Sequence, residues 1–173
     1  MSIVVGIADL VVSADPEETL VTHALGSCLG ITIYDPVTRI GGLLHVMLPD
    51  STIDPRKAED RPAMFVDTGV PRLFRDGYAL GAVKSRLIVK VAGGATTKGD
   101  PKDDYFRIGE RNFVALRKLL WKNNVLIESY DVGGTHSRTL TISMATGEVI
   151  VQSNGATVAL SRREEGYRCH STC

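Results

Sequence analysis

Apolar and polar residues alternate along several segments with the two-residue period of β-strands. The alternation is clearest at Leu29 to Tyr34 and at Leu140 to Met144, where apolar positions are separated by Gly, Thr or Ser. Mostly apolar runs predict further strands at Ile3 to Val12, Ile40 to Leu48, Arg86 to Val91, Val125 to Tyr130 and Glu148 to Gln152. The Thr146-Gly147 pair predicts a hairpin turn before the last of these strands.

Two longer segments have the helical period instead, with apolar residues three or four positions apart. Helices are therefore predicted at roughly Pro62 to Tyr78 and Gly109 to Asn123. Because strands occur both in succession and around these helices, a pure alternating β-α-β sheet is not expected. The pattern predicts an α/β or α+β sandwich.

The composition is that of an ordinary globular protein, with 43% hydrophobic and 23% charged residues in a chain of 173. Lys and Arg together number 20, as do Asp and Glu, so no net charge attracts nucleic acid or an anionic membrane. No segment approaches the roughly 18 apolar residues that cross a bilayer, and the first residues lack the features of a signal peptide. We therefore expect a cytoplasmic protein without membrane insertion. We also expect a folded domain at 1–153 and a polar C-terminal tail at 154–173.

Cys28 lies between Gly26 and Gly30, at the start of a predicted strand. Gly26 permits a sharp turn before the thiol, and Gly30 is expected to leave open space beside it for a substrate. A free cysteine on a strand is commonly a buried packing residue. The position of Cys28 alone therefore does not separate packing from catalysis.

A histidine on the following strand makes catalysis the better interpretation. Asp35-Pro36 predicts a turn, and if Asp35 pairs with Thr38 across it, Cys28 lies directly opposite His45. Opposed residues of an antiparallel pair share one face of the sheet. A register different by one residue would put His45 on the other face, so this inference depends on the length of the turn.

A neighbouring imidazolium stabilises the thiolate that attacks a carbonyl carbon, and the same histidine can protonate a departing amine. The pair therefore predicts amide chemistry, with Cys28 as nucleophile and His45 as general base. The alternative for His45 is a core histidine that bonds to the backbone. The chemistry requires no metal or cofactor, and the sequence contains no convincing site for either.

The C-terminal tail contains Cys169, His170 and Cys173, three soft ligands in a short stretch. A structural zinc site normally takes four ligands, and no fourth is evident. A tail without metal is therefore the preferred interpretation, and zinc binding remains an alternative.

Several motifs resemble those of the CheD family of chemoreceptor glutamine deamidases. The resemblance covers roughly Val5 to Val151 and includes Thr22, the LGSC segment that ends at Cys28, and His45 in HVMLPDS. It continues in the segments VAGGA at 91–95, IGERN at 108–112 and DVGG at 131–134.

The resemblance implies a sandwich of two mixed β layers flanked by helices, related to toxin-type cysteine deamidases. It also implies a catalytic set of Cys28, His45 and Thr22, in which the Thr22 hydroxyl orients the imidazole. The substrates would be glutamine side chains of methyl-accepting chemotaxis receptors, which a Cys thioester would convert to glutamate with release of ammonia. Backbone N–H groups at Ser27 and Cys28 are the candidates to stabilise the oxyanion.

A CheC-type chemotaxis phosphatase is the further partner that the resemblance implies. His23 departs from the family pattern, which often has Leu there, and is expected to face solvent. Two alternatives remain at this point. The chain could act as a non-catalytic adaptor that binds a phosphatase or receptor, or as another thiol hydrolase such as a peptidase.

Overall fold

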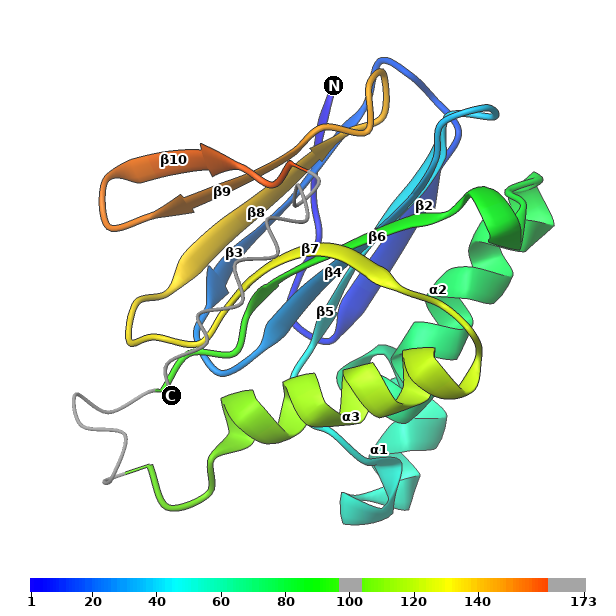
Figure 1. Ribbon diagram of the computed structural model, residues 1–173. Coiled ribbons are helices and arrows are strands. Elements are labelled where there is room, and N and C mark those ends of the chain that lie inside the picture. Colours follow the sequence, from blue (N-terminus) through cyan, green and yellow to red (C-terminus); the bar gives the residue numbers. More distant parts are fainter. Residues whose placement is uncertain (97–103, 162–173) are drawn as a thin grey trace, which may run out of the picture.

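Two β-sheets packed face to face form the centre of the molecule (Figure 1). The computed structural model describes residues 1–96 and 104–161, and in these residues each sheet has five strands. In order across the first sheet, the strands are β1 (Ser2–Val4), β3 (Thr19–Leu25), β8 (Arg138–Ser143), β9 (Val149–Ser153) and β10 (Ala156–Ala159). The second sheet contains β2 (Asp9–Ser13), β5 (Ile40–Val46), β4 (Leu29–Asp35), β6 (Ile88–Gly93) and β7 (Ile127–Val132).

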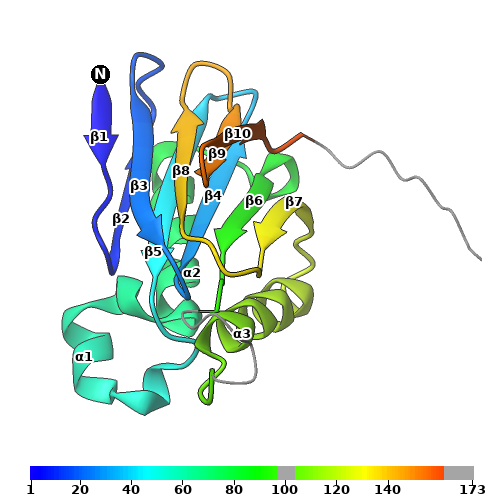
Figure 2. The same cartoon turned by 90° about the vertical axis from the view of Figure 1, so that its left-hand side faces the viewer.

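Each sheet combines one parallel pair of strands with antiparallel pairs: β1 runs parallel to β3, and β6 to β7. The predicted sandwich of two mixed β layers is therefore confirmed. The helices lie on the outer face of the second sheet (Figure 2). They are α1 (Pro55–Asp60), α2 (Val66–Leu80) and α3 (Ile108–Lys122), with short 3-10 turns at Ser51–Ile53, Pro62–Met64 and Lys84–Arg86. In the described residues, no helix is both long and apolar enough to span a membrane.

Two hydrophobic cores occupy the two faces of the second sheet. Leu29, Ile31 and Ile33 of β4 pack with α2 and α3 on one face. Tyr34 of β4 and Leu43 of β5 belong to a separate cluster that fills the space between the sheets. Because successive side chains of a strand point to opposite faces, these memberships identify which side chains of β4 and β5 face the first sheet.

The N-terminal segment differs from its prediction. The expected strand at Ile3 to Val12 is two strands in different sheets, β1 and β2, separated by residues 5–8. Ala8 has a positive φ of 55° in this connection, so the chain cannot continue as one strand there. Strand β3, which the hydrophobic pattern did not indicate, pairs along both edges with β1 and β8.

The C-terminal boundary also lies further along the chain than expected. Residues Ala156–Ala159 form β10, which pairs with β9 as a hairpin, and Leu160 is buried in the core between the sheets. The first part of the segment expected to be a polar tail therefore belongs to the folded domain. Cys169, His170 and Cys173 lie outside the described residues.

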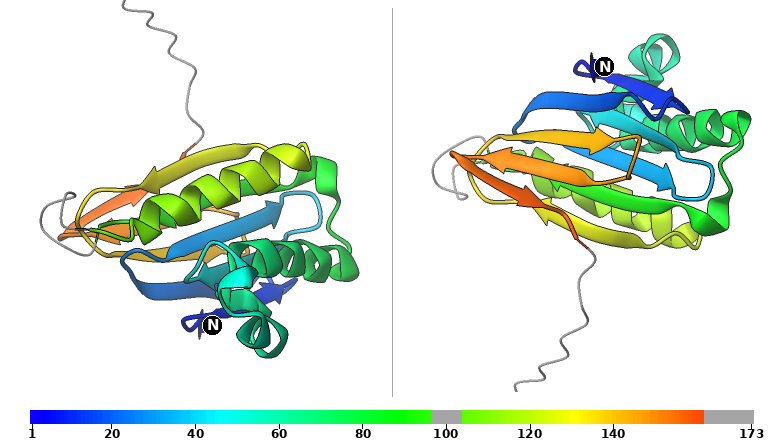
Figure 3. Two further views of the ribbon diagram at one scale, coloured as in Figure 1. Left: turned by 90° about the horizontal axis from the view of Figure 1, so that it is seen from below. Right: turned by 90° about the horizontal axis from the view of Figure 1, so that it is seen from above.

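The chain crosses from the first sheet to the second between β3 and β4, at Gly26, Ser27 and Cys28. Seen from below in Figure 3, this crossing lies at the same end of the sandwich as the start of α3. The residues of the predicted site are thus supplied by both sheets and by the loop that joins them.

Candidate functional site

A buried hydrogen bond joins the two sheets at the predicted catalytic histidine. Thr22 on β3 and His45 on β5 are both fully buried, and the Thr22 Oγ1 lies 2.7 Å from the His45 Nδ1. The same Oγ1 lies 2.8 Å from the carbonyl oxygen of Val5, to which it donates its proton. A hydroxyl has one proton to donate, so Thr22 must accept a hydrogen bond from the His45 Nδ1–H.

This arrangement determines the tautomer of His45. With the proton on Nδ1, the Nε2 atom carries a free lone pair and can act as a base. That Nε2 atom is buried and has no hydrogen-bond partner among the described residues. Burial lowers the pKa of His45 to about 4, which keeps the imidazole neutral at neutral pH. Thr22 thus presents His45 in the form that a general base requires.

The register between β4 and β5 differs from the predicted one by two residues. Asp35 pairs with Ile40, and Gly30, rather than Cys28, lies opposite His45. The connecting turn is longer than expected because the Asp35 carboxylate accepts hydrogen bonds from the N–H groups of Val37 and Thr38, which opens the turn. A shift by two residues preserves the face. Cys28, which packs against the core between the sheets, and His45, which bonds to Thr22 of the first sheet, therefore lie on the same side of the second sheet.

Two details expected around Cys28 are wrong. Gly30 does not leave open space, because an added Cβ would lie 2.7 Å from a Leu140 methyl and 2.8 Å from a Leu25 methyl. The sharp turn before the thiol centres on Ala24 and Leu25: Ala24 has φ 58°, and the Gly26 N–H donates to the Ala24 carbonyl at 2.9 Å. Access to the sulfur must therefore come from the loop side, not from the face of the strand.

Cys28 is a half-buried free thiol that packs against the core between the sheets. Burial raises the pKa of the Cys28 thiol, and its backbone N–H opposes this only in part. The thiol is therefore protonated at neutral pH, and the resting pair is neutral rather than a thiolate and an imidazolium. Among the described residues, neither the Ser27 N–H nor the Cys28 N–H donates to another residue.

The loop that carries Cys28 is held by hydrogen bonds on both sides. The Gly94 N–H donates to the Cys28 carbonyl, and the Ala95 N–H donates to the Gly26 carbonyl, each at 2.8 Å. The Asn112 Nδ2 donates to the Ser27 carbonyl at 3.0 Å and to the Met47 carbonyl at 2.9 Å.

The sequence pattern predicts no role in the site for the glycines at 93–94 or for Asn112. Both lie in motifs of the family resemblance, VAGGA and IGERN, and that was the available signal. Hydrophobic periodicity alone carries no information about them. His23, in contrast, is exposed as predicted, and its Nδ1 lies 3.3 Å from the Thr139 Oγ1.

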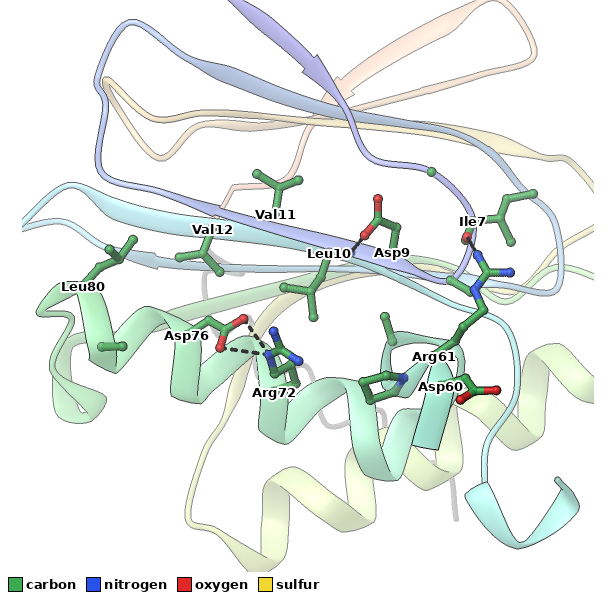
Figure 4. Close-up of a pocket in the computed structure, with 15 residues that line it drawn as sticks. Ile7, Asp9, Leu10, Val11, Val12, Asp60, Arg61, Arg72, Asp76 and Leu80 are labelled. Atoms are coloured by element: carbon green, nitrogen blue, oxygen red, sulfur yellow. Dashed lines mark hydrogen bonds and ion pairs between the residues drawn. The ribbon is translucent and has the colours of Figure 1, made fainter. Parts of the chain in front are cut away.

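A surface hollow of about 860 Å³ lies elsewhere, between β2 and α2 (Figure 4). Its lining includes Leu10, Arg61 and Arg72, and it contains none of Thr22, Cys28 and His45. The predicted chemistry therefore does not lie in this hollow. In the described part of the chain, no three His, Cys, Asp or Glu side chains come together as metal ligands.

Known proteins resemble this chain over most of its length. A family profile described as "CheD chemotactic sensory transduction" matches residues 47–153. A relative from Syntrophus aciditrophicus, named "Probable chemoreceptor glutamine deamidase CheD 1", is 50% identical over 153 residues, which cover 88% of this chain and 94% of the relative.

A relative with the same activity in its name, from Solibacter usitatus, is also 50% identical over 153 residues, covering 88% of this chain and 89% of its own. A relative from the archaeon Pyrococcus abyssi is 41% identical over 145 residues, which cover 84% of this chain and 87% of the relative. Matches of this extent and identity place the chain in the CheD family.

Proposed function

We propose that this protein is a chemoreceptor glutamine deamidase that uses Cys28 as nucleophile, His45 as base and Thr22 to orient the imidazole. The observation that supports it most is the Thr22–His45 hydrogen bond, which leaves an unprotonated Nε2 on the same face as the Cys28 thiol; this Nε2 has no hydrogen-bond partner among residues 1–96 and 104–161. A histidine that served only the core would have both ring nitrogens bonded. The names of the relatives supply the substrate.

The reaction begins from a neutral pair. As the Cys28 sulfur bonds to the carboxamide carbon, His45 Nε2 takes the thiol proton and the carbonyl electrons move onto oxygen. The Ser27 and Cys28 N–H groups, which donate to no other residue in the described part of the chain, stabilise that oxyanion. His45 then gives its proton to the nitrogen, the C–N bond breaks, and ammonia leaves behind a thioester.

Hydrolysis of the thioester regenerates the enzyme. His45 Nε2 takes a proton from water as the oxygen attacks the thioester carbon, and the departing sulfur recovers that proton. The product is glutamate, and no oxidant, metal or cofactor enters the balance. The burial that keeps both groups neutral makes this concerted transfer more favourable than a preformed ion pair, since charge in a buried site is costly.

The substrate glutamines would lie on the cytoplasmic helical bundle of methyl-accepting chemotaxis receptors, and the reaction would take place in the cytoplasm, where thiols stay reduced. Each conversion adds a negative charge to a helix surface, which changes repulsion between neighbouring helices. A CheC-type phosphatase is the proposed second partner.

Mass spectrometry of a receptor cytoplasmic fragment tests the proposal. Incubation with the protein is expected to convert specific glutamines to glutamates, and Cys28→Ala and His45→Ala are expected to abolish the conversion. Full activity of Cys28→Ala would overturn it. A stable complex without any conversion would favour the adaptor function, and cleavage of the fragment would favour a peptidase.

A further inference from the structure

A buried amide on α3 bonds to backbone carbonyls close to both members of the proposed catalytic pair. Asn112 is fully buried. Its Nδ2 donates to the carbonyl of Ser27, which precedes the nucleophile, and to the carbonyl of Met47, two residues after His45. In the described residues, Asn112 thus links the loop that carries Cys28 directly to the end of β5.

The orientation of this amide follows from its partners. Both neighbours are carbonyl oxygens, which only the NH₂ group can satisfy, so the side chain cannot be turned over. The Oδ1 atom is left buried without a hydrogen-bond partner among the described residues. An unpaired buried acceptor lowers the stability of the folded protein. Asn112 therefore makes its two donor contacts although its Oδ1 stays unpaired. An apolar residue at this position would not lose stability in this way.

The start of α3 packs closely against the segment at the end of β6 that bonds to the Cys28 carbonyl. An added Cβ on Gly109 would lie 2.5 Å from the Gly94 carbonyl oxygen, and the Gly94 N–H bonds to the Cys28 carbonyl. Only glycine allows this approach, and it places the next turn of the helix, with Asn112, beside Ser27. The helix thus supports the Cys28 loop at two points.

We propose that Asn112 is a positioning residue for the deamidase reaction. By holding the Ser27 and Met47 carbonyls on one amide, it sets the separation of the Cys28 thiol from the His45 Nε2. It does not touch the substrate. This inference rests on the proposed function, because it assumes that Cys28 and His45 react together.

The test compares wild type with Asn112→Ala and Asn112→Asp, which remove the donors with and without a change of size. Each is expected to lower kcat on the receptor fragment by about tenfold or more, as supporting contacts of reactive groups commonly do, while KM stays close to the wild-type value. The rate at which iodoacetamide alkylates Cys28 at neutral pH is expected to fall as well, because the base is displaced.

Asn123→Ala is the matched control. It removes an exposed amide just beyond the C-terminal end of α3, where the Asn123 Nδ2 donates to the Leu119 carbonyl at 2.8 Å. It is expected to leave kcat and the alkylation rate unchanged.

A purely structural role would lower the thermal midpoint of the variants while kcat, corrected for the folded fraction, stayed at the wild-type value. That result, in either folded variant, would overturn the proposal. Asn112→Asp preserves shape and provides the test if Asn112→Ala does not fold. Loss of deamidation in these variants does not bear on the proposed function, which is tested separately by wild type, Cys28→Ala and His45→Ala on the same receptor fragment.

Discussion

At Thr22, one hydroxyl bonds to two buried groups: it donates its proton to the Val5 carbonyl and accepts a hydrogen bond from the His45 Nδ1–H. The carbonyl has no freedom to change its role, because it can only accept. The hydroxyl proton is therefore always donated to this carbonyl, and His45 must carry its own proton on Nδ1, the nitrogen that faces Thr22. As a result, the Nε2 atom carries no proton and can act as a base.

Removal of this hydroxyl is expected to reduce both activity and stability. Thr22→Val keeps the shape but leaves the Nδ1–H and the Val5 carbonyl unpaired, and we expect kcat to fall by about tenfold to a hundredfold, with a loss of about 1–3 kcal/mol in the free energy of unfolding. Thr22→Ser retains the hydroxyl and is expected to keep most of the activity. Steady-state kinetics of both variants, with urea unfolding, is the measurement; equal kcat values for the two would contradict the role of the hydroxyl.

The buried neutral His45 is expected to make the protein sensitive to acid. The folded-state pKa is lowered from 6.5 to about 4, so between these values the unfolded chain binds more protons than the folded one. The free energy of unfolding therefore falls as the pH decreases through this window, by about 2 kcal/mol between pH values of about 7 and 5.

His45→Asn retains a donor toward Thr22 but does not titrate, so this part of the pH dependence should disappear in the variant. Urea unfolding at the two pH values measures it in both proteins. An equal pH dependence in wild type and variant would show that other groups are responsible.

The Cys28 thiol is expected to behave as a protonated group at neutral pH. Because burial raises its pKa from 9.0, the rate of alkylation by iodoacetamide should keep rising with pH beyond that value. Subtracting the labelling of Cys28→Ser removes the contribution of Cys169 and Cys173. A plateau at neutral pH would instead demonstrate a preformed thiolate.

Residue chemistry was partly predictable from the sequence. The face shared by Cys28 and His45 was predicted correctly although the register was wrong by two residues, because the period of a strand is two. The role of Thr22 came only from the family resemblance. Its partner lies on a strand of the other sheet, and no local pattern encodes which side chains meet across two packed sheets.

At the scale of elements, the end of β6 lies very close to the loop that carries Cys28 and supports it. Gly93 has φ 115°, and a Cβ there would lie 2.2 Å from the Cys28 carbonyl oxygen. No side chain fits in this space unless the loop moves. The glycine therefore determines how near β6 comes to the nucleophile.

Gly93→Ala is expected to displace the Cys28 loop and to reduce deamidation by at least about tenfold, since a small misplacement of a reacting group has large effects on rate. Gly133→Ala is the matched control, because Gly133 has φ 93° and nothing within 4 Å of its added Cβ. The control carries backbone strain of about 1–3 kcal/mol without a clash. Deamidation activity is measured at a temperature below the unfolding midpoints of both variants, which separates the effect of the clash from that of backbone strain. Similar losses of activity in both variants would contradict an effect of the clash.

Periodicity predicted the two long helices and most strands of the sheet centres well, and it failed for the short α1 helix and for three strands of the first sheet. The α3 helix agrees with its predicted range within one residue at each end, because a long amphipathic segment carries many concordant positions. Strands β1, β3 and β10 were missed or merged. Two of them are short, and β3 carries polar residues such as Thr22 and His23 whose places are decided by partners far along the chain.

At the scale of the whole molecule, the described chain continues past β9 to complete the first sheet. Leu160 fills part of the core between the sheets, and β10 covers the outer edge of β9. The core that surrounds Thr22 and Cys28 therefore includes a residue that follows the last strand.

Two truncations test this boundary. A chain that ends at Ser153 loses β10 and Leu160, and we expect it to be destabilised by about 2–5 kcal/mol, as for other large buried side chains that are removed. A chain that ends at Ser161 retains both and is expected to keep the stability and activity of the full chain. Thermal unfolding and deamidation assays of both proteins measure these effects. Equal stability of the two proteins would show that the folded domain ends at residue 153.

The proposed catalytic groups come from three places that meet only when the sandwich is complete: β3 in one sheet, β5 in the other, and the loop that crosses between them. Before the sheets pack, Cys28 has no core around it and His45 has no hydroxyl to select its tautomer. We therefore expect deamidation to require the final packing of the sheets, so that a folding defect produces an inert protein.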